Sequence, residues 1–311
     1  MKTIKINYSG FWPEFDKNDN FITNILKEQY IVEIAEKPDY LFYSIFSNDF
    51  YQYDCVRIFF TGECITPDFN LCDYAMAFDW IVFGDRYIRT PLYLLYPEAY
   101  EEEDRKALAK GWLKEKDKFC SFVYSNAGAD SYRMQLFDKI NQYMRVSSGG
   151  GYLNNAGGPV VDKRAFEQEH LFSIACENSS YPGYSTEKLL QAFQAHTIPI
   201  YWGDPLIGKV FNEKAFINCH AYGTIDEVVE RIKQLYDNET LYLEMLSEPI
   251  WNSGFTPKEQ MQNTKKFLYA IIEQPVDLAK RRNNSYWGRI YEGERKKLFS
   301  LQTVWRRIRR K

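Results

Sequence analysis

The segment LFSIACENSSYPGYSTEKLLQAFQAHTIPIYW, residues 171–202, decides the fold class. It starts with an apolar strand, passes through a polar loop, and continues as the helix TEKLLQAFQAH and the apolar strand IPIYW. Strands that alternate with helices are typical of an open α/β sheet, in which ligands bind outside the carboxyl ends of the strands. The loop ENSSYPGYSTEK, residues 177–188, lies at such an end and is the first candidate for a binding site.

The charge pattern at the end of this loop supports that interpretation. Thr186 is predicted to cap the helix through its hydroxyl, which places Glu187 and Lys188 in the first turn. The positive end of the helix dipole favours the glutamate and disfavours the lysine. A bound anion would explain the lysine, because free backbone N–H groups and the ammonium would act on it together. The alternative is a solvated lysine that the helix tolerates at a small cost.

The remaining chain repeats the alternation in two series. Residues 100–118 are charged and helical in pattern, and a second series begins at FCSFVYSN. The predicted divisions are an amino-terminal domain over 1–107, a linker over 108–117, a second domain over 118–290 and a basic tail over 291–311. Two such domains predict a cleft between them. Glu63 ends the apolar strand CVRIFFTGE, so it and the 177–188 loop are expected to face that cleft.

Composition excludes several classes of protein. A net charge of -3 over 311 residues argues against a dedicated nucleic-acid binder. None of the 6 cysteines forms a CxxC pair, and no metal-ligand cluster is visible; Gly203–Asp204–Pro205 holds a single aspartate. The amino terminus is expected to be a first strand and not a signal peptide, and no stretch reaches transmembrane length. A cytoplasmic protein with reduced thiols is expected.

The basic carboxyl-terminal run RKKLFSLQTVWRRIRRK, residues 295–311, is amphipathic. A helix there would place Leu298, Leu301, Trp305 and Ile308 on one face, with basic residues around it. This pattern predicts peripheral contact with an anionic membrane, at the inner face of the cell membrane. The alternatives are a helix docked on the protein itself and a frayed tail.

Two long ordered motifs resemble a known family. ENSSYPGYSTEKLLQAF with HTIPIYWGDP resembles the nucleotide-sugar motif of the α-1,3-fucosyltransferases, glycosyltransferase family 10. FFTGECITPDFNLCDYAMAFDWIVFGDRYIRTPLY, residues 59–93, is similar to the bacterial branch of that family. The chain departs from the better-known bacterial members in two respects: Cys64 replaces an asparagine, and tandem heptads before the carboxyl terminus are absent.

The resemblance implies a GT-B fold, an α/β architecture of two Rossmann-like domains that face each other across a cleft. It implies an inverting transferase that moves L-fucose from GDP-fucose to the GlcNAc or Glc of N-acetyllactosamine- or lactose-type acceptors in α-1,3 linkage, as in Lewis-type glycan synthesis. The carboxyl-side domain would hold the donor and the amino-side domain the acceptor. Two alternatives stay open: a transferase for another linkage, such as α-1,4, or another GDP-sugar, and a non-catalytic nucleotide-sugar-binding protein.

The resemblance also assigns roles to residues. Glu63 matches the proposed general base, which removes the proton of the attacking hydroxyl; the alternative is a glutamate bonded to backbone groups at a strand end. Arg133 and Lys188 match phosphate-binding positions, and their charges would replace a required metal, although stimulation by a divalent cation stays open.

Four further residues complete the expected donor site, and two aromatic residues are expected to stack on the acceptor. Glu187 matches a residue that binds hydroxyls of the ribose or the fucose. The other donor-site residues are Asn178, Tyr184 and Thr186, and the alternatives for Asn178 and Tyr184 are a turn asparagine and loop packing. Phe11 and Trp12 follow the first strand and are the acceptor candidates.

Overall fold

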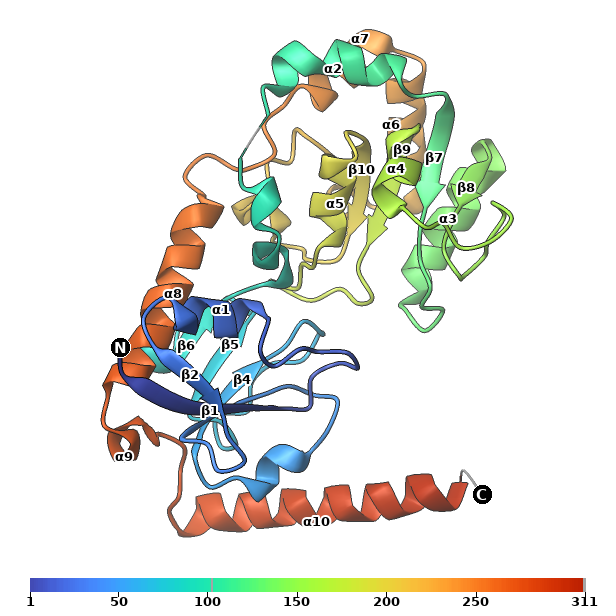
Figure 1. Ribbon diagram of the computed structural model, residues 1–311. Coiled ribbons are helices and arrows are strands. Elements are labelled where there is room, and N and C mark those ends of the chain that lie inside the picture. The colour runs from blue at the N-terminus through green and yellow to red at the C-terminus, as the bar shows by residue number, and fades with distance from the viewer. Residues whose placement is uncertain (102, 310–311) are drawn as a thin grey trace. The chain divides into compact units, whose positions relative to one another are not determined.

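The computed structural model describes residues 1–101 and 103–309, and the side chains of residue 99 and of residues 300–309 lie outside the description. The chain forms two compact units (Figure 1). Unit 1 combines Met1–Thr90 with the described part of Glu259–Lys311, and unit 2 is Pro91–Lys258. The sequence placed residues 259–290 with the second domain, whereas here they belong to the first unit.

Unit 1 is built on a six-stranded sheet in the order β2-β1-β3-β4-β5-β6, and every neighbouring pair is parallel. The strands are β1 (Thr3–Ser9), β2 (Ile31–Ile34), β3 (Tyr40–Tyr43), β4 (Val56–Phe60), β5 (Tyr74–Ala77) and β6 (Tyr87–Arg89). The helices are α1 (Phe21–Lys27), α8 (Pro257–Glu273), α9 (Val276–Ala279) and α10 (Tyr286–Arg309). All residues of β3 and β4 are buried, as parallel strands covered on both faces should be.

Helix α8 belongs to unit 1 because its side chains and backbone bond to the sheet. The Tyr40 hydroxyl donates to the Ile272 carbonyl oxygen at 3.4 Å, and the hydroxyls of Thr90 and Thr264 lie 3.2 Å apart. The amphipathic pattern of this helix shows that one face is buried, but it does not show which sheet covers that face.

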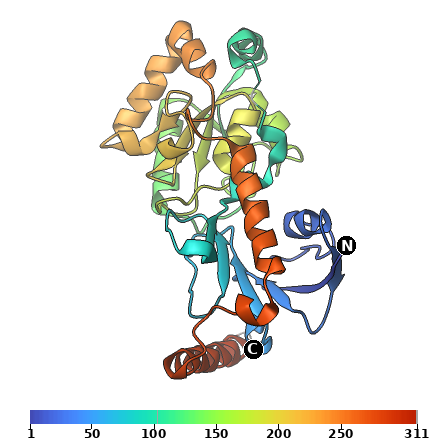
Figure 2. The same cartoon turned by 90° about the vertical axis from the view of Figure 1, so that its left-hand side faces the viewer.

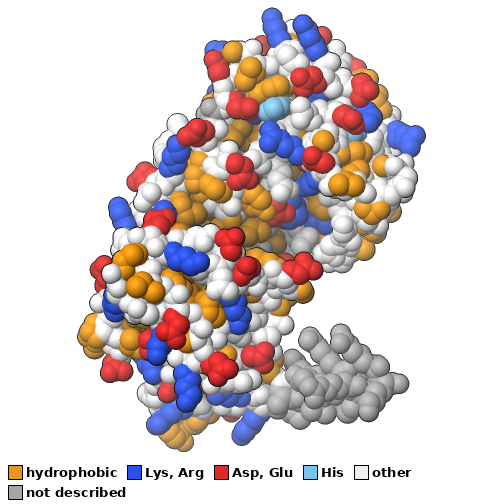
Figure 3. Space-filling view, viewed as in Figure 1, with side chains coloured by type: hydrophobic (Ala, Val, Ile, Leu, Met, Phe, Trp, Pro, Cys, Tyr) orange, Lys and Arg blue, Asp and Glu red, His pale blue; other side chains and the backbone are white. Residues whose placement is uncertain are grey.

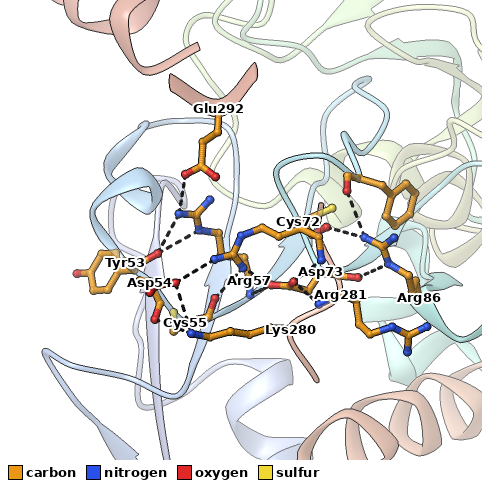
Figure 4. Close-up of polar contacts among 12 residues, drawn as sticks. Tyr53, Asp54, Cys55, Arg57, Cys72, Asp73, Arg86, Lys280, Arg281 and Glu292 are labelled. Atoms are coloured by element: carbon orange, nitrogen blue, oxygen red, sulfur yellow. Dashed lines mark hydrogen bonds and ion pairs between the residues drawn. The ribbon is translucent and has the colours of Figure 1, made fainter. Parts of the chain in front are cut away.

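The segment after α9 is attached to the sheet through Asp73 (Figure 4). This fully buried carboxylate accepts the backbone N–H groups of Arg57, Arg281 and Arg282, and it forms an ion pair with the Arg282 guanidinium. Arg57 in turn pairs with Glu292 of α10 at 3.0 Å. Four donors, from Arg57 of β4 and from residues 281–282, therefore converge on the Asp73 carboxylate, which directly precedes β5.

Unit 2 holds a second parallel sheet, in the order β11-β10-β9-β7-β8. The strands are β7 (Lys118–Phe122), β8 (Val146–Ser148), β9 (His170–Cys176), β10 (Ile198–Trp202) and β11 (Ile217–Asn218). The helices are α2 (Arg105–Lys114), α3 (Ser131–Tyr143), α4 (Lys163–Gln168), α5 (Lys188–Gln194), α6 (Ile225–Tyr236) and α7 (Glu239–Leu246). The expected linker, 108–117, thus lies largely inside α2.

Helices cover both faces of this second sheet (Figures 1 and 2). Helices α4 and α5 pack on one face, against β9 and β10. Helices α2, α3, α6 and α7 form the other layer and share one apolar core with the strands. Two parallel sheets, the second with helices on both faces, confirm the predicted α/β class of Rossmann-like units.

The surface and the carboxyl-terminal helix bear on possible partners. Basic and acidic side chains are interspersed on the face shown in Figure 3, in keeping with the small net charge. In α10, Leu298 is 51% exposed, whereas the predicted apolar-face residues Leu301, Trp305 and Ile308 lie outside the described side chains. Within the described residues, every helix is too short or too polar to span a membrane.

Candidate functional site

The 177–188 loop is closed by a buried carboxylate at its first residue. Glu177 follows β9 directly and is fully buried. One of its oxygens accepts the Thr186 backbone N–H at 2.7 Å, and the other accepts the Thr186 hydroxyl at 2.6 Å. The Lys188 ammonium lies 3.1 Å from the same carboxylate. The loop therefore folds back on its own beginning.

Lys188 has two acidic partners within the chain. Besides Glu177, its ammonium lies 3.3 Å from Glu187, and its side chain is only 15% exposed. Burial opposes the charged form, but the carboxylates of Glu177 and Glu187 outweigh it and raise the pKa of Lys188. Burial would also raise the pKa of Glu187, yet Lys188 reverses this and lowers the pKa. Both groups stay charged near neutral pH.

The predicted cap at Thr186 is wrong. Helix α5 begins at Lys188, its N-cap residue is Glu187, and no side chain caps it. The Thr186 hydroxyl is turned to the Glu177 carboxylate and also accepts a hydrogen bond from Lys188 Nζ at 2.8 Å. The hydroxyl thus donates to a carboxylate and accepts from an ammonium, and hydrogen bonds to charged groups are stronger than the neutral bond to a backbone N–H that a cap would make.

Arg133 is a buried cation beside the same loop. It lies in the first turn of α3 and is 1% exposed. Its Nη2 donates to the Asn178 side-chain oxygen at 2.8 Å and to the Cys176 carbonyl oxygen at 3.0 Å, and the guanidinium lies over the Tyr124 ring, 4.1 Å from its centroid. Among the described side chains, no carboxylate forms an ion pair with Arg133, and its Nε has no hydrogen-bond partner.

Arg133 and Asn178, two of the predicted donor residues, are thus in direct contact at the carboxyl end of β9. Asn178 also accepts the backbone N–H of Asp130, the cap of α3, through its carbonyl oxygen at 2.9 Å. Lys188 and Glu187 are joined to this strand end through Glu177. Unit 2 therefore brings together, around one loop, the buried Arg133, the Asn178 side-chain amide and Lys188, which pairs with two carboxylates.

Tyr184 is placed differently from the prediction. Its side chain is only 2% exposed, so its burial favours loop packing over contact with a ligand. The loop before it turns at Gly183, whose φ of 90° suits glycine and whose N–H donates to Asp204 at 2.7 Å. From the sequence, Glu177 was only the first residue of the loop and Asp204 had no assigned role. In the structure both carboxylates are buried and hold the loop through hydrogen bonds to Gly183 and Thr186.

In unit 1, Glu63 lies three residues beyond the carboxyl end of β4, as predicted. Its backbone N–H donates to the Thr61 hydroxyl at 2.9 Å, and its carbonyl oxygen accepts the Ile65 N–H at 2.7 Å. The backbone is held on both sides, whereas the side-chain carboxylate makes no hydrogen bond or ion pair to any described residue. The alternative of a side chain bonded to backbone groups at the strand end is therefore not what the described residues show.

The predicted acceptor residues lie in an aromatic cluster after β1. The Phe11 ring stacks on Phe15 with centroids 4.2 Å apart, and Trp12 meets Phe15 edge-on at 5.0 Å. Trp12 is 40% exposed, whereas Phe11 is more buried. Trp12 is thus the more exposed of the two rings, and Phe11 lies beside it with the ring centroids 5.6 Å apart.

Comparison with known proteins identifies the family. The domain described as "Glycosyltransferase family 10 (fucosyltransferase) C-term" matches residues 113–285. The chain belongs to glycosyltransferase family 10. A second family domain, "Alpha-(1,3)-fucosyltransferase FucT N-terminal domain", matches residues 6–96. The fucosyltransferase family assignment thus extends over both sheets.

Individual relatives of this family-10 chain agree. It is 33% identical over 287 residues to an alpha-(1,3)-fucosyltransferase, FucT, of Helicobacter pylori, and the match covers 79% of this chain and 60% of the relative. It is 37% identical over 198 residues to alpha-(1,3)-fucosyltransferase B of Drosophila melanogaster, with 57% of this chain and 44% of the relative covered. The chain therefore spans less than two thirds of either relative.

The fold of this family-10 chain matches a solved structure. A crystal structure of an alpha1,3-fucosyltransferase with GDP-fucose superposes with a TM-score of 0.73 at 29% identity, over 89% of this chain and 93% of the other. The predicted GT-B-like fold of two Rossmann-like units is confirmed.

Two histidines of this family-10 chain, His170 and His196, make contacts within the folded protein. His170 is buried, its Nδ1 lies 2.8 Å from the Phe166 carbonyl oxygen, and burial lowers its pKa to about 4. His196 stacks on Trp112 with centroids 4.0 Å apart. In the part of the chain that the structure describes, no group of three or more His, Cys, Asp or Glu residues could hold a metal ion.

Proposed function

We propose that the protein transfers L-fucose from GDP-fucose to the GlcNAc or Glc of N-acetyllactosamine- or lactose-type acceptors, in α-1,3 linkage and with inversion. Membership of the family supports the class of reaction, and the similar structure solved with GDP-fucose supports the donor. The observation that carries the proposal is Arg133, a buried cation without an ion-pair partner among the described residues, at a strand end where α/β sheets bind ligands.

In this proposal the diphosphate of the donor is the missing partner of Arg133. Its charge has no ion-pair partner among the described residues, and a buried cation in that state gains strongly from a nearby anion such as a phosphate. Asn178 holds the guanidinium in place. As the bond to the sugar breaks, charge grows on the β-phosphate, and a preorganised cation stabilises that transition state.

Lys188 is the second phosphate-binding residue in the proposal, and its role depends on its release from the carboxylates that it pairs with. Its charge is shared with Glu177 and Glu187, so it adds less net positive potential than a free lysine. Binding of a diphosphate would draw the ammonium toward the phosphate, while Glu187 accepts hydroxyls of the donor. Thr186 positions Lys188 through its hydroxyl, and Tyr184 shapes the loop from inside.

Glu63 is the proposed general base. The acceptor hydroxyl oxygen attacks the anomeric carbon, the bond from that carbon to the β-phosphate oxygen breaks, and GDP leaves with the electron pair. The hydroxyl proton passes to the Glu63 carboxylate. A carboxylate with a fixed backbone and no partner among the described residues is ready for this role. Trp12 provides a ring on which the acceptor sugar can stack.

The test is to incubate the protein with GDP-fucose and a panel of acceptors, and to read GDP release together with product linkage. Release with lactose and an α-1,3 product supports the proposal. An α-1,4 product, or transfer from another GDP-sugar only, supports the other-linkage alternative. Calorimetric binding of GDP-fucose without release for any acceptor supports a non-catalytic nucleotide-sugar-binding protein.

A further inference from the structure

A glycine-rich loop, residues 149–158, directly follows β8 and packs against the chain just beyond β7. The Tyr152 N–H donates to the Tyr124 carbonyl oxygen at 2.8 Å. At Gly150 the two segments lie so close that a Cβ atom there would overlap the Tyr124 backbone. Glycine is therefore required at position 150 by a close approach of two backbones, and the loop is built around Tyr124.

The loop is held in this shape by one of its own side chains. Asn154 Nδ2 donates to the carbonyl oxygens of Gly150 and Gly158 at 2.8 Å each, and Asn154 Oδ1 accepts the Gly158 N–H at 2.8 Å. The amide thus ties residue 150 to residue 158 and closes the loop. A loop closed in this way gives the backbone of Tyr124 a fixed support.

The Tyr124 side chain contacts both Arg133 and the strand end that binds it. Tyr124 is 8% exposed, and the Arg133 guanidinium lies over its ring, 4.1 Å from the centroid. The Tyr124 hydroxyl donates to the Ile174 carbonyl oxygen at 2.8 Å and accepts the Cys176 N–H at 2.7 Å. The Cys176 carbonyl oxygen in turn accepts Arg133 Nη2 at 3.0 Å. Tyr124 therefore fixes one face of the guanidinium with its ring and one acceptor of the guanidinium through its hydroxyl.

Within the described residues, the hydrogen-bond and ring partners of Arg133 are neutral. They are the Tyr124 ring, the Asn178 side-chain oxygen and the carbonyl oxygens of Asn126 and Cys176. Burial raises the pKa of Tyr124, so the hydroxyl keeps its proton. An aromatic face orients a cation without cancelling its charge, as a carboxylate would. Arg133 is therefore held in place with its full charge left for an anion.

We propose that Tyr124 is a positioning residue for donor binding: its ring and hydroxyl hold Arg133 for the diphosphate, and the 149–158 loop holds Tyr124. The proposal rests on the function proposed above, in which Arg133 binds phosphate, and it adds a residue that acts through Arg133 and not on the donor itself. The alternative is that Tyr124 and the loop only stabilise unit 2.

The test is a double-mutant cycle on GDP affinity, measured by calorimetry on the full chain. Tyr124→Leu removes the ring and the hydroxyl, and we expect it to weaken GDP binding by about 5- to 30-fold, the range of a desolvated contact between a cation and an aromatic ring. In an Arg133→Met background the same change should alter GDP affinity by less than about twofold, because the residue that Tyr124 positions is gone. Equal losses in the two backgrounds, or no loss in either, would overturn the proposal.

Two neighbouring glycines provide a matched pair that leaves the Tyr124 side chain intact. Gly150→Ala places a methyl group against the Tyr124 backbone, whereas a methyl group at Gly151 would lie 3.5 Å from Ser125 Oγ, an ordinary contact. Gly150→Ala should weaken GDP binding and lose that effect in the Arg133→Met background, and Gly151→Ala should keep the wild-type affinity. Equal GDP affinities of the two glycine variants would overturn the part of the loop.

Phe119→Leu controls for the loss of an aromatic ring from the adjoining strand. Phe119 lies in β7, is 7% exposed, and its ring contacts Tyr143, Phe172 and Tyr236. The change should lower the melting temperature and leave GDP affinity unchanged. If Phe119→Leu weakens GDP binding as much as Tyr124→Leu does, the effect at Tyr124 is a general loss of packing and the proposal fails.

Tyr124→Phe keeps the proposal testable if Tyr124→Leu does not fold. It retains the ring and leaves the Cys176 N–H without the hydroxyl oxygen. We expect it to weaken GDP binding by about two- to tenfold, the value of one hydrogen bond, and to have no effect in the Arg133→Met background. The same loss in both backgrounds would overturn the proposal.

Calorimetry with GDP needs no turnover, so it separates this proposal from the function on which it rests. If no acceptor takes fucose but the effect of Tyr124→Leu disappears in the Arg133→Met background, the positioning role is supported and the transferase function fails. If fucose is transferred but Tyr124→Leu has the same effect in both backgrounds, the function stands and the positioning role fails.

Discussion

Replacing Lys188 by methionine tests whether the loop of the donor site is held by its own ion pair. The change keeps most of the side-chain volume and removes the charge that lies 3.1 Å from the fully buried Glu177 carboxylate. At an effective dielectric constant of about 20, two charges at that distance attract by about 5 kcal/mol. Desolvation offsets part of this, and the loss of one partner from a buried pair costs about 3–5 kcal/mol.

We therefore expect Lys188→Met to lower the free energy of unfolding of unit 2 by about 3 kcal/mol, the lower end of that range because Lys188 is partly exposed. The assays are urea unfolding and amide hydrogen exchange of the 177–194 segment. The double variant Glu177→Gln/Lys188→Met should recover most of the loss, since the amide oxygen can still accept the Thr186 N–H. Lys233→Met, which breaks a surface pair with Glu230, is the control and should change little.

Two results would refute this reasoning. A Lys188→Met protein as stable as the wild type would show that Glu177 does not depend on the lysine. A double variant no more stable than Lys188→Met would show that the uncompensated carboxylate is not the cause. The double variant also isolates the phosphate role, because it restores the loop without the lysine: normal GDP affinity in it would exclude Lys188 from donor binding.

Four other changes give separate outcomes. Glu63→Gln should lower kcat by about 100- to 10,000-fold with unchanged GDP affinity in calorimetry, and near-normal turnover would place the base elsewhere. Arg133→Met should weaken GDP binding by about 10- to 100-fold, and unchanged affinity in a protein that still melts cooperatively would contradict its phosphate role. The pKa of His170 is lowered from 6.5 to about 4, so the unfolded chain binds the extra proton and stability should fall by up to about 3 kcal/mol as pH drops from 6.5 to 4. His170→Gln should lack that part of the pH dependence in urea unfolding, and an unchanged dependence would assign it to other groups. EDTA should leave fucose transfer intact because Arg133 and Lys188 supply the positive charge, and complete loss that Mn²⁺ restores would show a required metal.

The fold class follows from the sequence because strands and helices alternate with clear periodicity. The apolar runs that contain β4, β9 and β10 were identified directly. The division into units was not identified. The amphipathic pattern of a helix such as α8 indicates that one face is buried, but it does not indicate which sheet that face packs against. Apolar character alone does not define a strand either: Trp80–Phe83 lies beyond the end of β5, and all four side chains are at least 38% exposed.

At the site, the sequence indicated which residues matter better than it indicated their contacts. Arg133 and Asn178 stand 45 positions apart and do meet. The unusual position of Lys188 was noticed, but its partner Glu177 was missed, because a glutamate at a strand end gives no sign that it will be buried. Thr186 was misassigned for the same reason, since a cap preference is local and the carboxylate that captures the hydroxyl is brought in by the loop.

The discontinuous first unit has a consequence for how the chain is made. Residues 91–258 are continuous and can fold as soon as they leave the ribosome, whereas the amino-terminal sheet must wait for α8 and for residues 281–282. Until those residues are synthesised, the Asp73 carboxylate has neither the Arg281 and Arg282 N–H groups nor the Arg282 guanidinium to compensate its burial. The early sheet is therefore the last part to mature, and a released fragment that ends at residue 258 would contain all of unit 2 but would lack the residues that compensate Asp73.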